Sequence, residues 1–177
     1  MVAEDRIMDE KETFTLGFYF RTLSGVLAEP RRFFSELHPG AGMFQPLMFL
    51  IVSSLLFTGG SFMGTGETLS IAGGILFVNA VGMVFIASAF GYLILVMMAG
   101  RRVGYGRFFT VYALSAGVTL LASWIPFFLW ITEPWKWWLI GTGMIHYLGL
   151  TRTRAWIVIG LSIAVMVLLF QSLLPLL

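Results

Sequence analysis

Long apolar segments separated by short polar stretches make up the chain from Met43 onward. A hydrocarbon core about 30 Å thick is crossed by roughly 20 helical residues, so segments of this length are candidate transmembrane helices. We expect five of them, at about 43–63, 69–98, 108–131, 134–150 and 155–177. The fourth is short, but helix tilt and local thinning of the bilayer accommodate a few ångströms. The sequence therefore predicts an all-α integral membrane protein whose residues 41–177 form a five-span membrane domain.

The second segment has two interpretations, because one helix over 69–98 would be about 45 Å long. It is either a single tilted or kinked span or a tight hairpin. Lysines and arginines near spans collect on the cytoplasmic side of a membrane. With one second span and a cytoplasmic N-terminus, ten of the 11 lysines and arginines lie inside, whereas a hairpin leaves six inside and five outside. The charges favour five spans, with the N-terminus in the cytoplasm and the C-terminus outside.

A more polar region precedes the first span. Residues 1–13 form a polar tail. In residues 14–40 charged positions interrupt apolar ones, and Phe20, Leu23 and Leu27 follow the i, i+3, i+7 spacing of an amphipathic helix. Within this segment the sequence RRFF follows Pro30, a residue suited to the first turn of a helix. Charges this frequent do not cross a bilayer. We therefore expect a helix at the membrane surface, with the phenylalanine rings in lipid and the guanidinium groups toward phosphates.

Composition supports lipid as the surroundings of the chain. Its residues are 58% hydrophobic and 11% charged, whereas about 25% of residues are charged in soluble proteins. The sequence has no cysteine, which excludes disulfides, thiolate catalysis and cysteine-ligated zinc. Its two histidines are far apart and its glycines match no dinucleotide fingerprint, so we expect neither a metal nor another cofactor. The net charge of +2 gives no indication of nucleic-acid binding.

Several short motifs follow one another in a recognisable order. The sequence EPRRFFSEL precedes GMFQPLMFLIV at the first span, GRRVGYGRFF opens the third, Pro126 lies late in the third, and IGTGMIHYLGL lies in the fourth. In this order, over about residues 20–177, the chain resembles the Yip family of Ypt/Rab-interacting membrane proteins in its compact bacterial form. The resemblance implies a five-span helical fold with a cytoplasmic N-terminus, in the bacterial inner membrane. Eukaryotic members act in vesicle traffic, bind Rab-type GTPases and have a longer N-terminal region. Only about 40 residues precede the first span here, which argues against Rab binding.

Five arginines are candidate binding residues on the cytoplasmic side. An arginine near an anionic membrane surface contributes about 1 kcal/mol of attraction. We expect one basic patch that binds lipid phosphates or an acidic partner, and the alternative is that these residues only orient the chain in the membrane. The residues are Arg31, Arg32, Arg101, Arg102 and Arg107.

Asn79 and His146 are the candidate polar residues inside spans. Polar groups at membrane depth often serve transport or proton transfer, so His146 is a candidate for a proton relay or substrate site. The simpler interpretation is a hydrogen bond to a neighbouring helix or, for His146, contact with headgroups. Glu67 and Glu133 are expected to be solvated in loops. No pair of carboxylates lies within a span, so an acid–base enzyme is not indicated.

The leading hypothesis is a non-enzymatic membrane adaptor or scaffold. Its partners would be membrane lipids and other membrane proteins, including further copies of the same chain. Small residues four apart, which let helices approach closely, favour such contacts. The alternative is a small transporter or channel subunit, which usually has several polar groups and broken helices at the membrane midplane. A lipid-modifying enzyme ranks third, since no nucleophile and base are evident.

Overall fold

The computed structural model describes residues 14–38, 42–62, 71–99 and 103–173. All regular structure within these residues is helical, which confirms the predicted all-α class. The elements are α1 (Leu16–Ala28), α2 (Pro30–Glu36), α3 (Phe44–Phe62), α4 (Ile71–Ala99), α5 (Tyr105–Ser123), the 3-10 helix η1 (Pro126–Phe128), α6 (Leu129–His146) and α7 (Arg152–Leu173).

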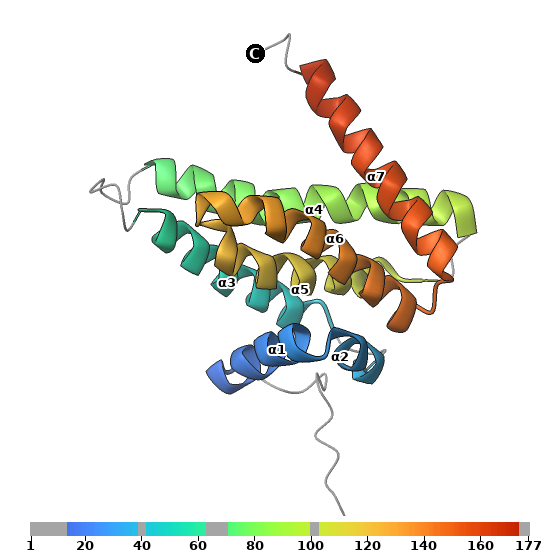
Figure 1. Cartoon of the computed structure of the whole chain (residues 1–177), viewed down its shortest axis with the longest axis horizontal. Coiled ribbons are helices and arrows are strands. Elements are labelled where there is room, and N and C mark those ends of the chain that lie inside the picture. The colour runs from blue at the N-terminus through green and yellow to red at the C-terminus, as the bar shows by residue number, and fades with distance from the viewer. Residues whose placement is uncertain (1–13, 39–41, 63–70, 100–102, 174–177) are drawn as a thin grey trace, which may run out of the picture.

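Helix α5 is the centre of the structure, with α3, α4 and α6 packed around it and α1 in contact at the side (Figure 1). Every residue from Phe108 to Thr119 is buried. A Cβ atom at Gly117 would lie 2.7 Å from the ring of Phe49 on α3. On α6, a Cβ atom at Gly143 would lie 2.6 Å from Val111 on α5. Glycine therefore brings both neighbouring helices close to α5, as small residues do in membrane proteins.

Helices α1 and α2 pack against the flank of the α3–α5–α6 bundle (Figure 1). The side chain of Thr15 accepts a hydrogen bond from the backbone of Phe18 at the start of α1, and a proline opens α2. The hydroxyl of Tyr19 lies 3.1 Å from that of Ser53, in the middle of α3. The pair of helices is thus joined to the bundle by buried contacts.

The phenylalanine rings of the RRFF sequence lie inside the protein, and the prediction that they enter lipid is wrong. Phe33 is 3% exposed and Phe34 is fully buried. Phe34 lies against Gly143, where a Cβ atom would be 3.1 Å from its ring, and Phe33 lies against Gly25. Gly25 of α1 and Gly143 of α6 leave room for these two rings, whereas Phe20 and Leu27 of α1 remain exposed. The arginines of this amphipathic segment remain exposed, as expected.

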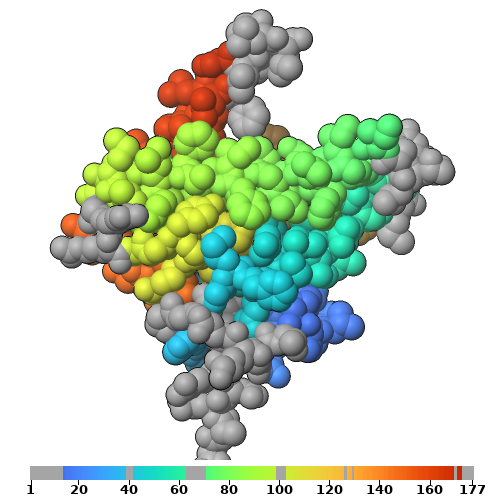
Figure 2. Space-filling model, turned by 180° about the vertical axis from the view of Figure 1, so that it is seen from behind, coloured from blue at the N-terminus to red at the C-terminus, as the bar shows by residue number. Residues whose placement is uncertain are grey.

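Helix α4 is one continuous helix of 29 residues, so the hairpin interpretation of the second segment is excluded. Figure 2 shows it lying across one face of the molecule. Large apolar side chains are exposed along its whole length: Ile71, Ile75, Val78, Ile86, Leu93 and Met97. A helix that exposes such residues without a polar face is suited to lipid.

Three helices, α3, α4 and α7, are long and apolar enough to cross a membrane, and they match the first, second and fifth predicted spans. Within the described part of the chain, α5 and α6 do not reach that standard. Arg107 lies in α5, and Glu133 and Lys136 lie in α6, which reduces their apolar character. Helix α7 packs on α4 and α6 through its first half and then leads away from the bundle (Figure 1).

The boundary between the third and fourth predicted segments is corrected. Helix α5 ends at Ser123, eight residues before the expected end, and α6 begins at Leu129 and contains Pro134. Pro126 lacks the N–H group that a further turn of α5 would need, and η1 reverses the chain there. The aromatic residues that follow therefore belong to α6.

We expect Gly117→Ala to destabilise the fold and Gly82→Ala to leave it unchanged or slightly more stable. The new methyl group at position 117 would press on the Phe49 ring, whereas nothing lies within 4 Å of a Cβ atom at Gly82. Overpacking of this kind costs about 1–3 kcal/mol. Thermal unfolding of both variants in the same detergent measures the difference, and equal midpoints would contradict the packing described.

Candidate functional site

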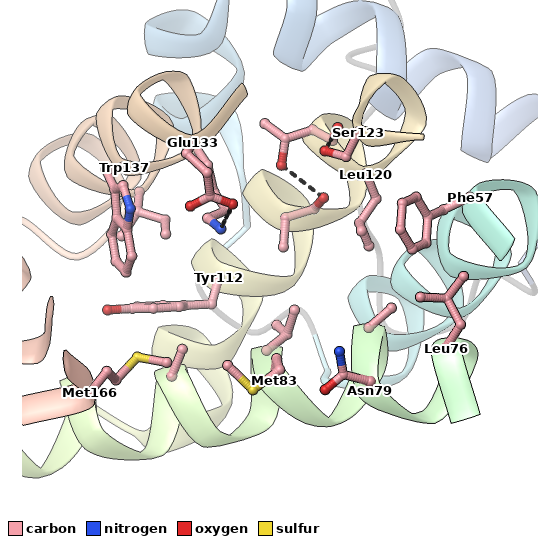
Figure 3. A pocket seen from close by; sticks show the side chains of 17 residues that line it. Phe57, Leu76, Asn79, Met83, Tyr112, Leu120, Ser123, Glu133, Trp137 and Met166 are labelled. Atoms are coloured by element: carbon pink, nitrogen blue, oxygen red, sulfur yellow. Dashed lines mark hydrogen bonds and ion pairs between the residues drawn. The ribbon is translucent and has the colours of Figure 1, made fainter. Parts of the chain in front are cut away.

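A cavity of about 220 Å³ lies between α4, α5 and α6, with one residue each from α3 and α7 (Figure 3). Five polar side chains line it, four from the end of α5 and the start of α6 and one from α4: Thr119, Ser123, Glu133, Lys136 and Asn79. Apolar side chains line the remainder: Phe57, Leu76, Ala80, Met83, Val84, Ala87, Ala116, Leu120, Trp137, Ile140 and Met166. The aromatic ring of Tyr112 also lines it. The lining is therefore mainly apolar; we call the part where α5 meets α6, with its charged and hydroxyl groups, the polar end and the part lined by Met83, Val84, Ala87 and Met166 the apolar end.

Glu133 and Lys136 form an ion pair at the polar end. The two residues are one turn apart on α6, and the Lys136 Nζ lies 2.6 Å from the Glu133 Oε1. The side chain of Lys136 is 23% exposed and that of Glu133 is 51% exposed. Lys136 also lies 5.5 Å from the centre of the Trp137 ring. Glu133 was expected to be solvated in a loop; its side chain is exposed as expected, but it lies in α6 and not in a loop.

Hydroxyl groups link the end of α5 to the start of α6 beside this ion pair. Ser123 donates to the Thr132 hydroxyl at 3.3 Å and to the Thr119 carbonyl at 2.8 Å. The Ser123–Thr132 hydrogen bond joins the two helices across the turn at η1, whereas the bond to Thr119 lies within α5. The position of Glu133 relative to α5 is set by this contact.

The ring of Tyr112 lines the cavity between its polar and apolar parts. Its ring lies between Glu133 and Trp137 on one side and Met83 and Met166 on the other (Figure 3). The side chain is 2% exposed. Its hydroxyl lies beside α4, where a Cβ atom at Gly91 would be 2.5 Å away. Gly91 therefore leaves the space that this tyrosine occupies.

Asn79 and His146 do not come together. Asn79 is exposed on α4 and lines the rim of the cavity. His146 was expected within a span, but it is the last residue of α6, is exposed, and does not line the cavity. Only Asn79 contributes to the candidate site. Glu67 lies outside the described residues.

The predicted basic patch separates into residues with different surroundings. Arg31 and Arg32 are exposed on α2. Arg32 pairs with Glu36 at 2.7 Å and with Glu29 at 3.5 Å. The hydrogen bond to Glu36 raises the pKa of Arg32, so this residue stays cationic. Arg101 and Arg102 lie outside the described residues.

Arg107 is a structural residue of the bundle. Its Nη2 donates to the backbone oxygen of Tyr147 at 2.9 Å, and its guanidinium carbon lies 4.9 Å from the centre of the Tyr147 ring. It therefore joins the start of α5 to the end of α6, and it is partly buried, unlike the exposed Arg31 and Arg32.

No group of three histidine, aspartate or glutamate side chains that could hold a metal ion occurs among the residues that the structure describes. A comparison with protein families matches the Yip1 domain over residues 24–174. The chain belongs to the Yip1 domain family. This confirms the resemblance found in the sequence. No curated protein and no solved structure matches the chain.

The Yip1 domain begins within α1 and extends past α7, so the cavity and the α1–α2 contacts both belong to it. Sequence reasoning missed Lys136 and Tyr112 as parts of the site. The three-residue spacing of Glu133 and Lys136 was a signal for an ion pair on one helical face. Tyr112 gave no signal, because its place in the cavity depends on α4 and α6.

We expect Arg107→Gln to lower the free energy of unfolding by about 1.5–3 kcal/mol, the usual contribution of a hydrogen bond to a charged group. Its contact with the Tyr147 carbonyl links α5 to α6. The control is Arg31→Gln, since Arg31 is exposed and has no ion pair among the described residues. Chemical denaturation in detergent measures the free energy of unfolding of both variants. A loss as large for Arg31→Gln would contradict the structural role of Arg107.

Proposed function

We propose that this Yip1-domain membrane protein is a non-enzymatic adaptor whose α1–α2 unit binds an acidic membrane partner. The observation that carries the proposal is the fixed position of a charged surface. Buried rings at Tyr19, Phe33 and Phe34 attach α1 and α2 to the bundle, while Arg31 and Arg32 point outward. A polar surface attached to an otherwise apolar protein is suited to recognition.

The charges on α2 contribute little to folding. Exposed ion pairs such as Arg32–Glu36 stabilise a protein little, because water and salt screen the attraction. Arg31 has no ion pair in the described part of the chain. An exposed, uncompensated arginine that is held in place by neighbouring anchors offers a directed hydrogen-bond donor to carboxylates or phosphates. This favours a partner of acidic character, either a membrane protein or an anionic lipid surface.

We further propose the five-span arrangement, with the N-terminus in the cytoplasm. The distribution of lysine and arginine supports it, and so does the single helix α4, because that distribution favours one second span over a hairpin. Helices α5 and α6 would cross the membrane with most of their polar groups turned toward other helices, as Arg107 is toward Tyr147.

A transporter is the second candidate, because Asn79 and the Glu133–Lys136 pair line the cavity between α4, α5 and α6. The cavity stops at Tyr112, however, and none of its lining residues on α5 lies between Tyr112 and the start of that helix. His146, the other candidate for transport, is elsewhere. The cavity therefore supports binding better than passage.

Arg31→Glu is expected to reduce recovery of cross-linked partners at least about tenfold, because a difference of 1.4 kcal/mol already changes an equilibrium tenfold. The matched control is Arg154→Glu, a charge reversal at another exposed arginine near the start of α7. Cross-linking in intact membranes, followed by quantitative mass spectrometry, compares the two. Equal partner recovery from both variants and the natural chain would contradict the adaptor role of α2.

The chain has no cysteine, so single-cysteine variants report its orientation directly. We expect Trp130→Cys, near the start of α6, to react with a membrane-impermeant maleimide in intact cells. Arg154→Cys should react only after the membrane is permeabilised. Labelling of position 154 from outside would overturn the five-span arrangement. The natural, cysteine-free chain is the control.

A further inference from the structure

We propose that the cavity between α4, α5 and α6 binds one zwitterionic phospholipid. The Glu133–Lys136 pair would recognise its headgroup, and the apolar end of the cavity would hold part of an acyl chain. This goes beyond the adaptor role, which depends on α2 at the other side of the bundle.

The lining of the cavity matches an amphiphile. Charged and hydroxyl side chains lie at the end where α5 meets α6. Apolar side chains from α4, α6 and α7 form the other end, including Met83, Val84 and Met166. Ligand sites combine a mainly apolar wall with a few polar groups that fix orientation. A ligand that is polar throughout, or apolar throughout, would leave one of these ends unmatched.

The ion pair selects a headgroup that carries both signs. Glu133 and Lys136 are both partly exposed, so each can reach a second partner in addition to the other. A phosphate alone would be attracted by the lysine and repelled by the carboxylate. An amine alone would be attracted by the carboxylate and repelled by the lysine. A headgroup with a phosphate and a protonated amine offers a partner to both. The geometry therefore favours phosphatidylethanolamine over phosphatidylglycerol.

The shape and opening of the cavity agree with one lipid entering from the side. Asn79 and Glu133 line the cavity and are exposed, whereas Tyr112 in the same lining is buried. The volume of about 220 Å³ has room for part of one chain, since one water molecule occupies only about 30 Å³ in the liquid. Apolar residues of α4 are exposed beside the rim, where Figure 2 shows this helix on the surface. A lipid can thus enter from the bilayer without crossing it.

Native mass spectrometry of the full chain, stripped of lipid in detergent, tests the proposal. The chain is titrated with phosphatidylethanolamine, with phosphatidylglycerol of the same acyl chains, and with soluble glycerophosphoethanolamine. We expect one bound phosphatidylethanolamine at roughly tenfold higher affinity than phosphatidylglycerol, and no binding of the soluble headgroup. Equal affinity for the two lipids, or equal binding of the soluble headgroup, would overturn the proposal.

Two substitutions assign the headgroup contacts. Glu133→Gln should remove the preference for phosphatidylethanolamine without weakening phosphatidylglycerol, and Lys136→Gln should weaken both lipids. The control is Glu36→Gln, which removes an exposed carboxylate on α2, away from the cavity. If Glu133→Gln retains the same preference as this control, the ion pair does not select the headgroup and the proposal is wrong.

Ala87→Leu provides a second approach that leaves the charges in place. Ala87 lines the apolar end of the cavity, so the larger side chain should displace the acyl chain and lower binding of both lipids. Its thermal unfolding midpoint without lipid shows whether the variant is folded. If the added side chain prevents folding, the headgroup substitutions decide the question alone. Unchanged binding by a folded Ala87→Leu chain would place the lipid elsewhere.

Discussion

The close approach of helices at glycine is the contact on which the rest of this structure depends. Lipid chains are as apolar as leucine, so helices in a membrane gain little from hiding apolar side chains and must gain from close packing. Gly117 admits Phe49, Gly143 admits Val111 and Phe34, and Gly91 admits Tyr112. Each glycine is matched to a large side chain on another helix. The buried centre at α5, the attachment of α2 and the place of Tyr112 in the cavity lining all follow from these pairings.

The charged residues divide according to what surrounds them. Arg107 is partly buried and bonds to the backbone of Tyr147, so it contributes to the fold. Arg31 is exposed beside an ion pair that stabilises little, so it is available for recognition. Glu133 and Lys136 neutralise each other at the rim of a cavity. Charged residues thus have three roles in this chain, and the surroundings of each residue determine which role it has.

Much of the architecture could be predicted because it depends on local pattern. The length of apolar segments and the position of lysine and arginine gave the helical class and α4 as one helix, and the order of short motifs gave the family. The start of α6 was misplaced because Pro134 resembles the first residue of a helix, whereas it lies inside one. The burial of Phe33 and Phe34 and the cavity itself depend on glycines of distant helices, and no local pattern reports such contacts. Five membrane crossings remain a prediction.

The packing of Phe34 beside Gly143 couples the position of α2 to the positions of α6 and α5. The ring is fully buried, and the hydroxyl of Tyr147 donates to the backbone of His38 just after α2 at 3.4 Å. The ring of Tyr147 in turn contacts the guanidinium of Arg107. Separating α2 from the protein would therefore require the Phe34 ring to be withdrawn from α6. It would also displace the first turn of α5. A force applied at the arginines of α2 would therefore reach α5 through the contacts of α2 with α6.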